Sequence, residues 1–368
     1  MIARIVLLLL LLLTALAAGP VAAEDFARVG NFGPVFAHLP VDARGEAMGL
    51  ATTVDPSGPT AFWWNPAPLP ESDRVMVSYT LYDHPLDLLD WRPLAIRASR
   101  GNLTFGYLWG RGSTGPVLVR TAYDPDGNGA TIEYGADLHL FGFAADLAAW
   151  IAGDDASWRW TLGATVHHQR EHIDGSGEPA WDPDPDLIPT DVAISAWDAD
   201  LGTTLAWRAV DAPEASLQLL GTFTVRNLLR SDWDVGPSAT PLPRSYHLGV
   251  GLEAGLGARR GDARLVQATA SYAWRRDLED IGWPRESEHL GLELLVAGLF
   301  AARAGHRTDD KYRGEGWSLG AGLRYRFDAW WGIRAAVDYA RFAPDRLGDL
   351  QDPDAQEHWT FTAGVDLP

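Results

Sequence analysis

The amino-acid sequence predicts an all-β protein, a transmembrane antiparallel β-barrel of about fourteen strands. Three observations lead to this fold class: an export signal with no spanning helix after it, segments in which apolar and polar residues alternate, and connections that alternate between short turns and long acidic loops. A soluble chain of 368 residues would suggest about two domains, but one barrel with its loops also accounts for this length.

Composition excludes several classes of function. The formal net charge is −19, from 30 Lys and Arg against 49 Asp and Glu, so the chain lacks the cationic surface that a nucleic-acid partner requires. The chain contains no cysteine, which rules out disulfides, a thiolate nucleophile and cysteine-ligated metal sites. The 17 tryptophans and 38 glycines suit a β protein with aromatic anchors at membrane interfaces.

Residues 1–23 have the layout of a secretory signal peptide. Arg4 precedes a leucine run over residues 7–13, and small residues lead up to Ala23, after which we expect cleavage. The alternative is an uncleaved anchor, but the apolar core is shorter than the roughly 20 residues that a spanning helix needs. No later segment has 18 consecutive apolar residues. The predicted location of the mature chain is therefore the outer membrane or the space beyond the cytoplasm, and strands must provide any membrane crossing.

From about residue 72 the chain alternates with a period of two residues, as strands with two different faces do. The clearest segment is 317–327, whose odd-numbered positions are apolar and whose even-numbered positions are small or polar. Candidate strands lie near residues 74–82, 91–99, 102–110, 116–123, 131–143, 157–170, 190–208, 215–229, 244–258, 264–276, 288–296, 298–307, 316–328, 330–342 and 357–367. Residues 116–123 are the weakest candidate, and counting them as loop leaves about fourteen strands, an even number as in outer-membrane barrels.

A soluble β-sandwich also alternates, so the connections and the aromatic residues decide between the two folds. Turns such as 99–101 and 328–329 are short, whereas 173–189 and 343–356 are long and acidic. Several apolar faces carry aromatic residues at an end and aliphatic residues in the middle, which is the layout of strands that face lipid. Both features favour the membrane barrel.

The segment between the signal peptide and the first strand does not alternate, and it carries a recognisable motif. The motif residues are Ala43, Arg44, Met48, Gly49, Asp55, Trp64, Asn65, Pro66, Ala67 and Leu69. They resemble the N-terminal region of the PorV/PorQ-type family, part of the wider FadL-like group of outer-membrane transport proteins. The chain departs from the family pattern at Asp42 and Leu50, where glycine is usual, and at Pro68, which replaces the glycine before the leucine.

After the signal peptide over 1–23, the resemblance implies two parts: a hatch over 24–71 that folds into the lumen, and a barrel over 72–368. An unplugged barrel of this size would leave an open lumen, and irregular backbone at membrane depth needs protein or water around it. Pro66 biases Asn65 towards an extended conformation, so that the Asn65 side chain can satisfy nearby backbone groups. The alternative is that residues 65–67 simply turn the chain into the first strand, which is compatible with a hatch.

The function implied by the resemblance is passive uptake of small hydrophobic or amphipathic molecules, gated by the hatch. The alternative is a PorV-like accessory role in protein secretion; a purely structural barrel and a soluble extracytoplasmic β protein are further readings. The expected partners are outer-membrane lipid, a hydrophobic small molecule in the lumen, and secretion-system proteins under the alternative. We expect neither an enzyme nor a cofactor.

Several other motifs resemble chemical sites. Residues 168–172 match the His-x-x-Glu-His signature of a zinc protease, but they continue an alternating strand instead of a helix, so we expect no such site. Residues 124–129 resemble the first half of a calcium loop but lack the glutamate at position 12, so a turn between strands explains them and calcium binding is the alternative. Residues 182–186 form an acidic loop, which is a solvated segment or, as the alternative, a divalent-ion site. Four arginines on polar faces line the lumen or neutralise acidic neighbours there: Arg159, Arg324, Arg326 and Arg334. The last strand ends in Pro368, where barrels of this group usually end in an aromatic residue.

Overall fold

The computed structural model describes residues 39–71, 74–83, 90–118, 130–153, 157–177, 192–234, 239–242, 244–260, 263–277, 286–309, 315–327, 332–347, 350–351 and 356–366. The predicted signal peptide and hatch residues 24–38 lie outside these ranges. So do Pro368, the calcium-like loop 124–129 and the acidic loop 182–186.

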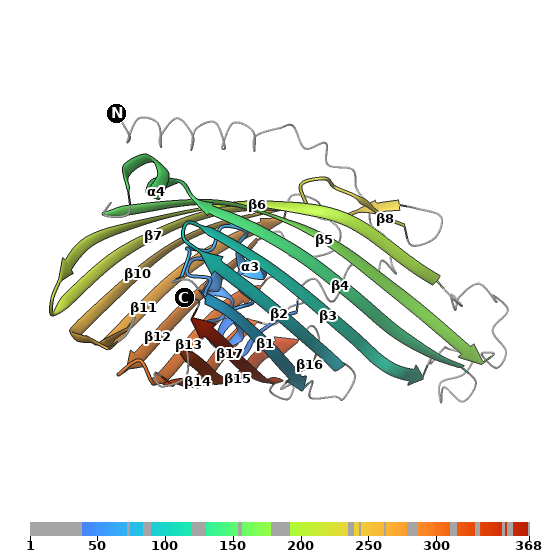
Figure 1. Ribbon diagram of the computed structural model, residues 1–368. Coiled ribbons are helices and arrows are strands. Elements are labelled where there is room, and N and C mark those ends of the chain that lie inside the picture. The colour runs from blue at the N-terminus through green and yellow to red at the C-terminus, as the bar shows by residue number, and fades with distance from the viewer. Residues whose placement is uncertain are drawn as a thin grey trace.

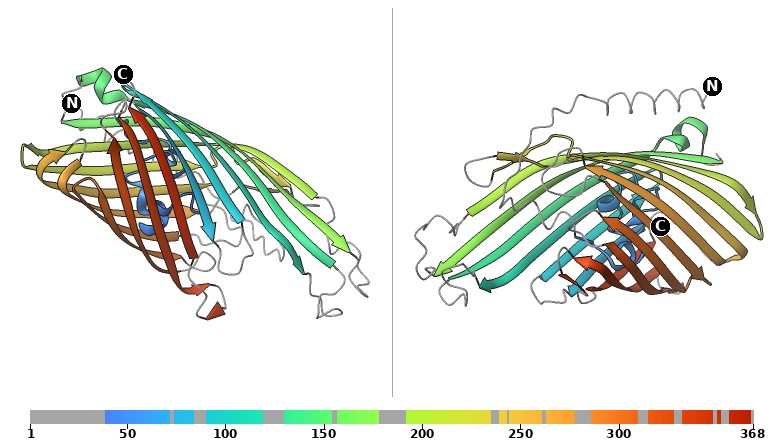
Figure 2. Two further views of the ribbon diagram at one scale, coloured as in Figure 1. Left: turned by 60° about the horizontal axis from the view of Figure 1, so that its bottom comes forward. Right: turned by 180° about the vertical axis from the view of Figure 1, so that it is seen from behind.

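Within the described residues, fourteen strands pair antiparallel in a closed ring (Figures 1 and 2). Each strand pairs with the next along the chain, and β17 closes the ring by pairing with both β1 and β15. The ring consists of β1 (Arg74–Asp83), β2 (Asp90–Arg100), β3 (Leu103–Leu118), β4 (Ala130–Asp146), β5 (Trp158–Gly177), β6 (Val192–Ala212), β7 (Ala215–Arg226), β10 (Ser245–Arg260), β11 (Ala263–Asp277), β12 (Glu286–Val296), β13 (Phe300–Asp309), β14 (Glu315–Phe327), β15 (Ile333–Leu347) and β17 (Gln356–Asp366).

Three shorter strands stand apart from the ring. β8 (Asp232–Asp234) and β9 (Ala239–Pro241) pair with each other, and β16 (Leu350–Gln351) pairs antiparallel with the end of β15. The predicted number of about fourteen strands is confirmed. The weak candidate strand 116–123 is described only over residues 116–118. These three residues form the end of β3 and not a strand of their own.

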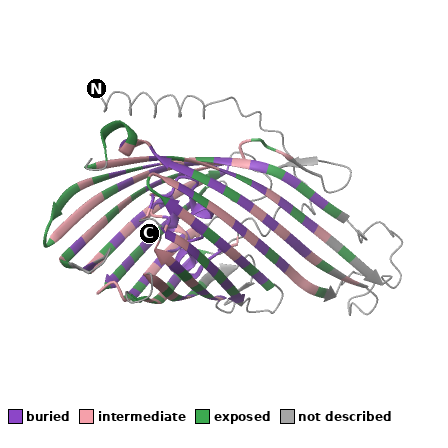
Figure 3. Cartoon of the chain, in the orientation of Figure 1, coloured by how far each residue is buried: buried purple, intermediate pink, exposed green. Residues whose placement is uncertain are grey.

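Buried and exposed residues alternate along the barrel strands, as the period-2 pattern predicts (Figure 3). In β12 the side chains of Leu290 and Leu292 face outward with 51% and 60% exposure, whereas His289 and Glu293 are buried inside. This arrangement exposes aliphatic side chains to the surroundings and is the one that a lipid solvent favours. No helix of the described residues has the length and apolarity to span a bilayer.

The two rims of the barrel differ. Short turns join β2 to β3, β6 to β7, β10 to β11 and β12 to β13, all at one rim, and the same rim carries α4 (Leu147–Ala152) between β4 and β5. Longer connections lie at the other rim, towards which β3 to β6 extend with 16 to 21 residues each. We refer to these ends as the short-turn rim and the long-loop rim.

The hatch, described from residue 39, lies within the barrel (Figure 2). It contains α2 (Ala43–Ala47), the 3-10 helix η2 (Ala51–Thr53) and α3 (Ala61–Trp64), whose residues are buried. The expectation of a hatch segment in the lumen is confirmed.

Candidate functional site

Asp42 connects the two α-helices of the hatch, α2 and α3. Its side chain caps α2 by accepting a hydrogen bond from the Gly45 backbone N–H at 2.5 Å. It also accepts hydrogen bonds from Thr60 Oγ1 at 2.6 Å and from Trp64 Nε1 at 2.7 Å, at the two ends of α3. Asp42 departs from the family pattern, yet it satisfies an orphan donor of a helix N-terminus and two buried side-chain donors at once.

Asn65 holds the segment that follows α3. Its side-chain amide donates to the Thr53 carbonyl and to Thr204 Oγ1, each at 3.1 Å, and its Oδ1 accepts from the Ala67 N–H at 2.8 Å. The backbone of Asn65 is extended, with φ −150° and ψ 126°, as expected for a residue before Pro66. The predicted use of the Asn65 side chain to satisfy backbone groups is confirmed, and the contact with Thr204 adds an anchor on β6.

Arg44 connects the hatch to a charged network on the barrel wall. Its guanidinium lies 3.0 Å from the Asp55 carboxylate and 3.2 Å from Glu293 of β12. Glu293 also pairs with Arg303 of β13 at 2.5 Å and with Arg324 of β14 at 3.5 Å. Each buried charge of this network therefore has a counter-charge within 4 Å. Removal of one partner would leave a buried guanidinium or carboxylate without its counter-charge, which destabilises a protein strongly.

Glu46 of α2 makes a second set of polar contacts with the wall, to residues of β13, β14 and β17. The Glu46 carboxylate is fully buried and lies 3.3 Å from Arg307, 3.4 Å from Ser318 Oγ and 3.9 Å from His358 Nε2. Burial raises the pKa of Glu46, and the Arg307 guanidinium opposes that rise. Together with Arg44, Glu46 directs α2 towards the polar sector of the lumen.

Glycines of the barrel wall make room for the hatch. Gly106 of β3 and Gly142 of β4 are register partners, and a Cβ atom on either would lie 2.1 or 2.2 Å from the Phe62 ring of α3. No side chain fits at that distance, so the paired glycines form a notch that receives the ring.

A second notch receives the segment after Asn65. Gly163 of β5 pairs with Gly202 of β6, and a Cβ atom on Gly163 would lie 1.8 Å from the Pro66 carbonyl oxygen. At Gly202 a Cβ atom would lie 2.5 Å from Asn65 Oδ1. Glycine therefore lets the backbones of hatch and wall approach each other closely.

A third notch lies on the opposite wall. Gly291 of β12 pairs with Gly305 of β13, where a Cβ atom would lie 2.7 Å from the Met48 carbonyl oxygen and 2.1 Å from the Gly49 N atom, respectively. We call these three pairs the glycine notches. They hold the hatch at separate places around the wall, so the wall is shaped to this segment.

The rest of the hatch packs on an apolar sector formed by β1 to β4. Phe62, Trp63 and Trp64 of α3 belong to a buried cluster whose wall residues include Trp91, with no exposed surface, and Leu108. Opposite this sector, the charged residues of β12 to β15 face α2. The lumen therefore has an apolar, aromatic sector and a charged sector, with the hatch between them.

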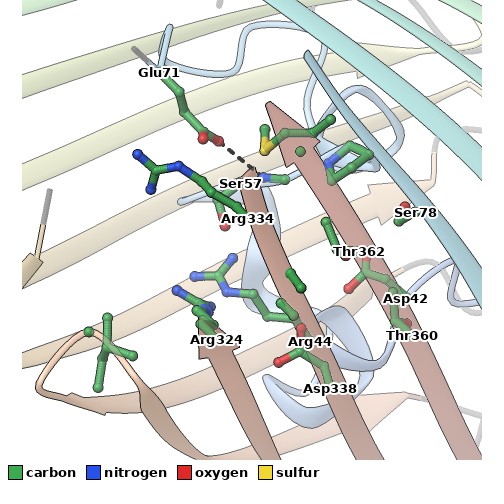
Figure 4. A pocket seen from close by; sticks show the side chains of 18 of the residues that line it. Asp42, Arg44, Ser57, Glu71, Ser78, Arg324, Arg334, Asp338, Thr360 and Thr362 are labelled. Atoms are coloured by element: carbon green, nitrogen blue, oxygen red, sulfur yellow. Dashed lines mark hydrogen bonds between the residues drawn. The ribbon is translucent and has the colours of Figure 1, made fainter. Parts of the chain in front are cut away.

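A cavity of about 880 Å³ remains between the hatch and the wall, next to the turn at 297–299 on the short-turn rim (Figure 4). Pro56, Leu69 and Leu299 contribute apolar surface. Its charged lining consists of Asp42, Arg44, Asp55, Glu71, Arg74, Glu253, Glu293, Arg324, Arg326, Arg334 and Asp338. The cavity is thus amphipathic, with charges of both signs.

The arginines predicted on polar faces all have acidic partners. Arg334 and Arg326 lie 3.0 Å and 3.1 Å from Asp366, and Arg159 lies 2.6 Å from Asp146. Arg324 pairs with Glu293, as described above. Both expectations apply: Arg324, Arg326 and Arg334 line the cavity and also neutralise carboxylates.

The structure brings the motif residues together inside the lumen. Ala43 donates its N–H to Thr360 Oγ1 of β17 at 2.8 Å, Arg44 binds Asp55, and Trp64 binds Asp42. Met48 and Gly49 lie in one notch, and Pro66 and Ala67 lie in another. Sequence reasoning missed Phe62 and the glycine notches; the many glycines on the polar faces of candidate strands were the available signal.

The zinc-protease-like motif is no metal site. Its residues belong to β5, where His168 faces outward against Trp197 with ring centroids 4.7 Å apart, while Glu171 is buried inside. Among the described residues, no group of three or more His, Asp and Glu side chains could hold a metal ion.

No protein-family model and no curated protein matches the chain. Among solved structures, the toluene transporter TbuX of Ralstonia pickettii aligns with a TM-score of 0.51 at 14% identity, over 89% of this chain and 98% of that one. A FadL homologue of Pseudomonas aeruginosa gives a TM-score of 0.45 at 11% identity over 89% and 99% of the two chains. The CymD monoaromatic hydrocarbon channel gives 0.48 at 8% identity over 89% and 97%. The likeness to TbuX shows a shared barrel fold.

Proposed function

We propose that this chain is an outer-membrane barrel for passive uptake of small hydrophobic or amphipathic molecules, with the hatch as its gate. The observation that carries the proposal is a closed barrel whose lumen holds residues 39–71 and keeps a cavity of about 880 Å³ beside them. This volume is within the roughly 300–1,000 Å³ of small-molecule sites. The fold shared with a toluene transporter supports the proposal.

The chemistry of the lumen suits an amphipathic or apolar substrate. The aromatic cluster around Phe62 and Trp91 offers apolar surface on the β1–β4 side, and the charged network around Glu293 offers polar partners on the other side. The outward leucines of β12 support placement in lipid. A molecule that crosses the barrel must pass the hatch, because hatch helices contact wall residues on both sectors.

A disulfide between hatch and wall tests the gating role. An added Cβ atom at Gly291 would lie 3.2 Å from Ala51 Cβ, close to the roughly 3.5–4.5 Å of a disulfide. The natural chain has no cysteine, so Ala51→Cys with Gly291→Cys forms one defined cross-link. In liposomes loaded with a solvatochromic reporter, we expect oxidation to abolish toluene uptake by the double variant and a reductant to restore it.

The reduced double variant is the matched control, because a Cβ atom at Gly291 would lie 2.7 Å from the Met48 carbonyl oxygen in both redox states and only the cross-link differs between them. Ala51→Cys alone, treated with the same oxidant, should keep its uptake. Full uptake by the completely cross-linked barrel would contradict a gating hatch while leaving transport intact. If neither the natural chain nor any variant gives uptake above protein-free liposomes for toluene or for a fatty acid, the transport proposal itself is wrong.

The accessory role in protein secretion is the alternative. The surface for such partners would be the long loops, of which 119–129 and 178–191 lie outside the described residues. Co-purification of secreted cargo with the full chain, lost on shortening these loops, would favour it over transport.

A further inference from the structure

The outer face of β3, β4 and β5 changes character in a regular way along each strand. Towards the short-turn rim the outward residues are large and apolar, and Phe105, Phe141 and Val166 are 53%, 52% and 45% exposed. Approaching the long-loop rim, the next register row consists of Trp109, His139, His168 and Trp197, which are successive cross-strand partners on β3 to β6.

Two residues further along the same strands, the outward row becomes charged. Arg92 of β2, Arg111 of β3, Asp137 of β4 and Arg170 of β5 are successive cross-strand partners. Alternate residues of a strand share a face and are about 7 Å apart, so this row lies directly beyond the aromatic row. Because barrel strands tilt, the row rises obliquely around the wall.

Two exposed arginines of this row share one acidic neighbour, Asp137, and form no ion pair with it. Arg92 pairs with Asp90 at 2.6 Å. In contrast, Arg111 and Arg170 are exposed and form no ion pair or side-chain hydrogen bond within the part of the chain that the structure describes. They flank Asp137 on neighbouring strands, roughly 10 Å apart.

Elsewhere on the outer face, the corresponding positions are balanced or acidic. Arg276 of β11 lies 3.8 Å from its register partner Glu286, and Glu288 follows two residues later on β12. On β15, Arg341 has Glu357 of β17 as its register partner. In the β3–β5 row, by contrast, the single carboxylate of Asp137 lies between two arginines, so this row carries an excess of positive charge in a chain of net charge −19.

We propose that the outer face of β3 to β5 binds a phosphorylated lipid headgroup of the leaflet at the long-loop rim, through Arg111 and Arg170. The guanidinium fork matches phosphate oxygens geometrically, and aromatic and imidazole rings prefer the boundary between hydrocarbon and headgroups. The acyl chains of the same lipid would lie along Phe105, Phe141 and Val166. This inference rests on the membrane location in the proposed function, but it concerns the outside of the barrel.

Native mass spectrometry of the folded full chain in detergent tests the proposal. The probes are lipid A with its phosphates and the same lipid A after enzymatic removal of its phosphates. We expect the natural chain to retain the phosphorylated form roughly tenfold better, and the variant R111Q/R170Q to lose this preference, because each lost charge-assisted hydrogen bond weakens binding. Inorganic phosphate alone should not displace the lipid, because it cannot occupy the apolar rows.

Arg276→Gln, an outward arginine on the other side of the barrel, is the matched control and should keep the preference. Heat-modifiable gel mobility shows that each variant is folded. Equal retention by the natural chain and R111Q/R170Q, or retention that ignores the phosphates, would overturn the proposal. Toluene uptake per folded barrel should be unchanged in R111Q/R170Q, so a failure of lipid binding and a failure of transport are separate results.

Discussion

At the scale of single residues, the carboxylate of Asp42 does most to keep α2 and α3 together. Asp42→Ala removes a helix cap and leaves Trp64 Nε1 and Thr60 Oγ1 buried without their acceptor. A lost cap costs about 1 kcal/mol and an unsatisfied buried donor about 1–3 kcal/mol. We expect hatch amides to exchange with solvent roughly 100-fold faster, while barrel amides are unaffected.

Asp42→Asn is the graded companion variant, because its single amide oxygen can keep the cap on the Gly45 N–H at the Oδ1 position but puts an NH2 group where Oδ2 accepts from Thr60 and Trp64. We expect its hatch amides to exchange at a rate between those of the natural chain and Asp42→Ala. Hydrogen exchange with peptide-level resolution measures both variants. Exchange in Asp42→Ala that equals exchange in the natural chain would mean that the α2–α3 connection does not depend on this carboxylate.

The glycine notch at Phe62 gives a second prediction. A Cβ atom at Gly142 would overlap the Phe62 ring at 2.2 Å, so Gly142→Val should displace α3 and destabilise the hatch by about 1–3 kcal/mol, the usual cost of overpacking. Protease cleavage within residues 39–71 should increase. A Cβ atom at Gly221 meets nothing within 4 Å, so Gly221→Val is the control.

The double variant Gly142→Val/Phe62→Ala separates the notch from a general effect on strand β4. Removal of the ring should relieve the overlap, so the double variant should be cleaved less than expected from the sum of the single variants. Additive effects would indicate that the valine acts on the barrel and not through Phe62.

At the scale of elements, the connection between hatch and β1 depends on the charge of Glu71. Burial alone would raise the pKa of Glu71, but the guanidinium groups of Arg97 and Arg74 outweigh it and hold the pKa below its ordinary value of 4.5. A carboxyl group whose pKa is lowered by folding stabilises the folded state above its unfolded pKa, and loses that contribution as the pH falls through the folded pKa.

We therefore expect amides near residue 71 to keep their protection from neutral pH down to about pH 4.5, and to lose it progressively below that value. Glu71→Gln should lower protection at neutral pH and abolish the acid dependence. Hydrogen exchange between pH 3 and 7 checks both, and a Glu71→Gln variant with the natural acid profile would assign the dependence to another group.

Sequence reasoning predicts local elements well and contacts between distant elements poorly. The strand at 317–327 was predicted because its alternation is local, and Asn65 because proline restricts the residue before it. The partners of the hatch were not predictable in this way. Gly106 and Gly142 meet Phe62 only after β3 and β4 have paired in one register, and Arg44 meets Glu293 across 249 positions of the chain.

At the scale of the whole molecule, closure of the ring leaves no strand of the barrel with an unpaired edge. A closed ring that is apolar outside resists detergent, because every strand must separate from two neighbours before it unfolds. We expect the full chain to migrate on SDS gels faster when unheated than after boiling, and to need detergent in solution. A monodisperse species without detergent would contradict the membrane barrel.

The ring closure also determines the order of assembly. Residues near 43 leave the ribosome early, but Ala43 hydrogen-bonds Thr360 across 317 positions, and the third glycine notch is built by β12 and β13. Contacts at such separation form late, because the intervening chain must first be ordered. The hatch is synthesised before the barrel strands, but it therefore reaches its final position after them. A chain truncated before β12 lacks the third glycine notch, Thr360 and the Glu293 and Arg307 partners of α2, so its hatch cannot take up the arrangement of the closed ring.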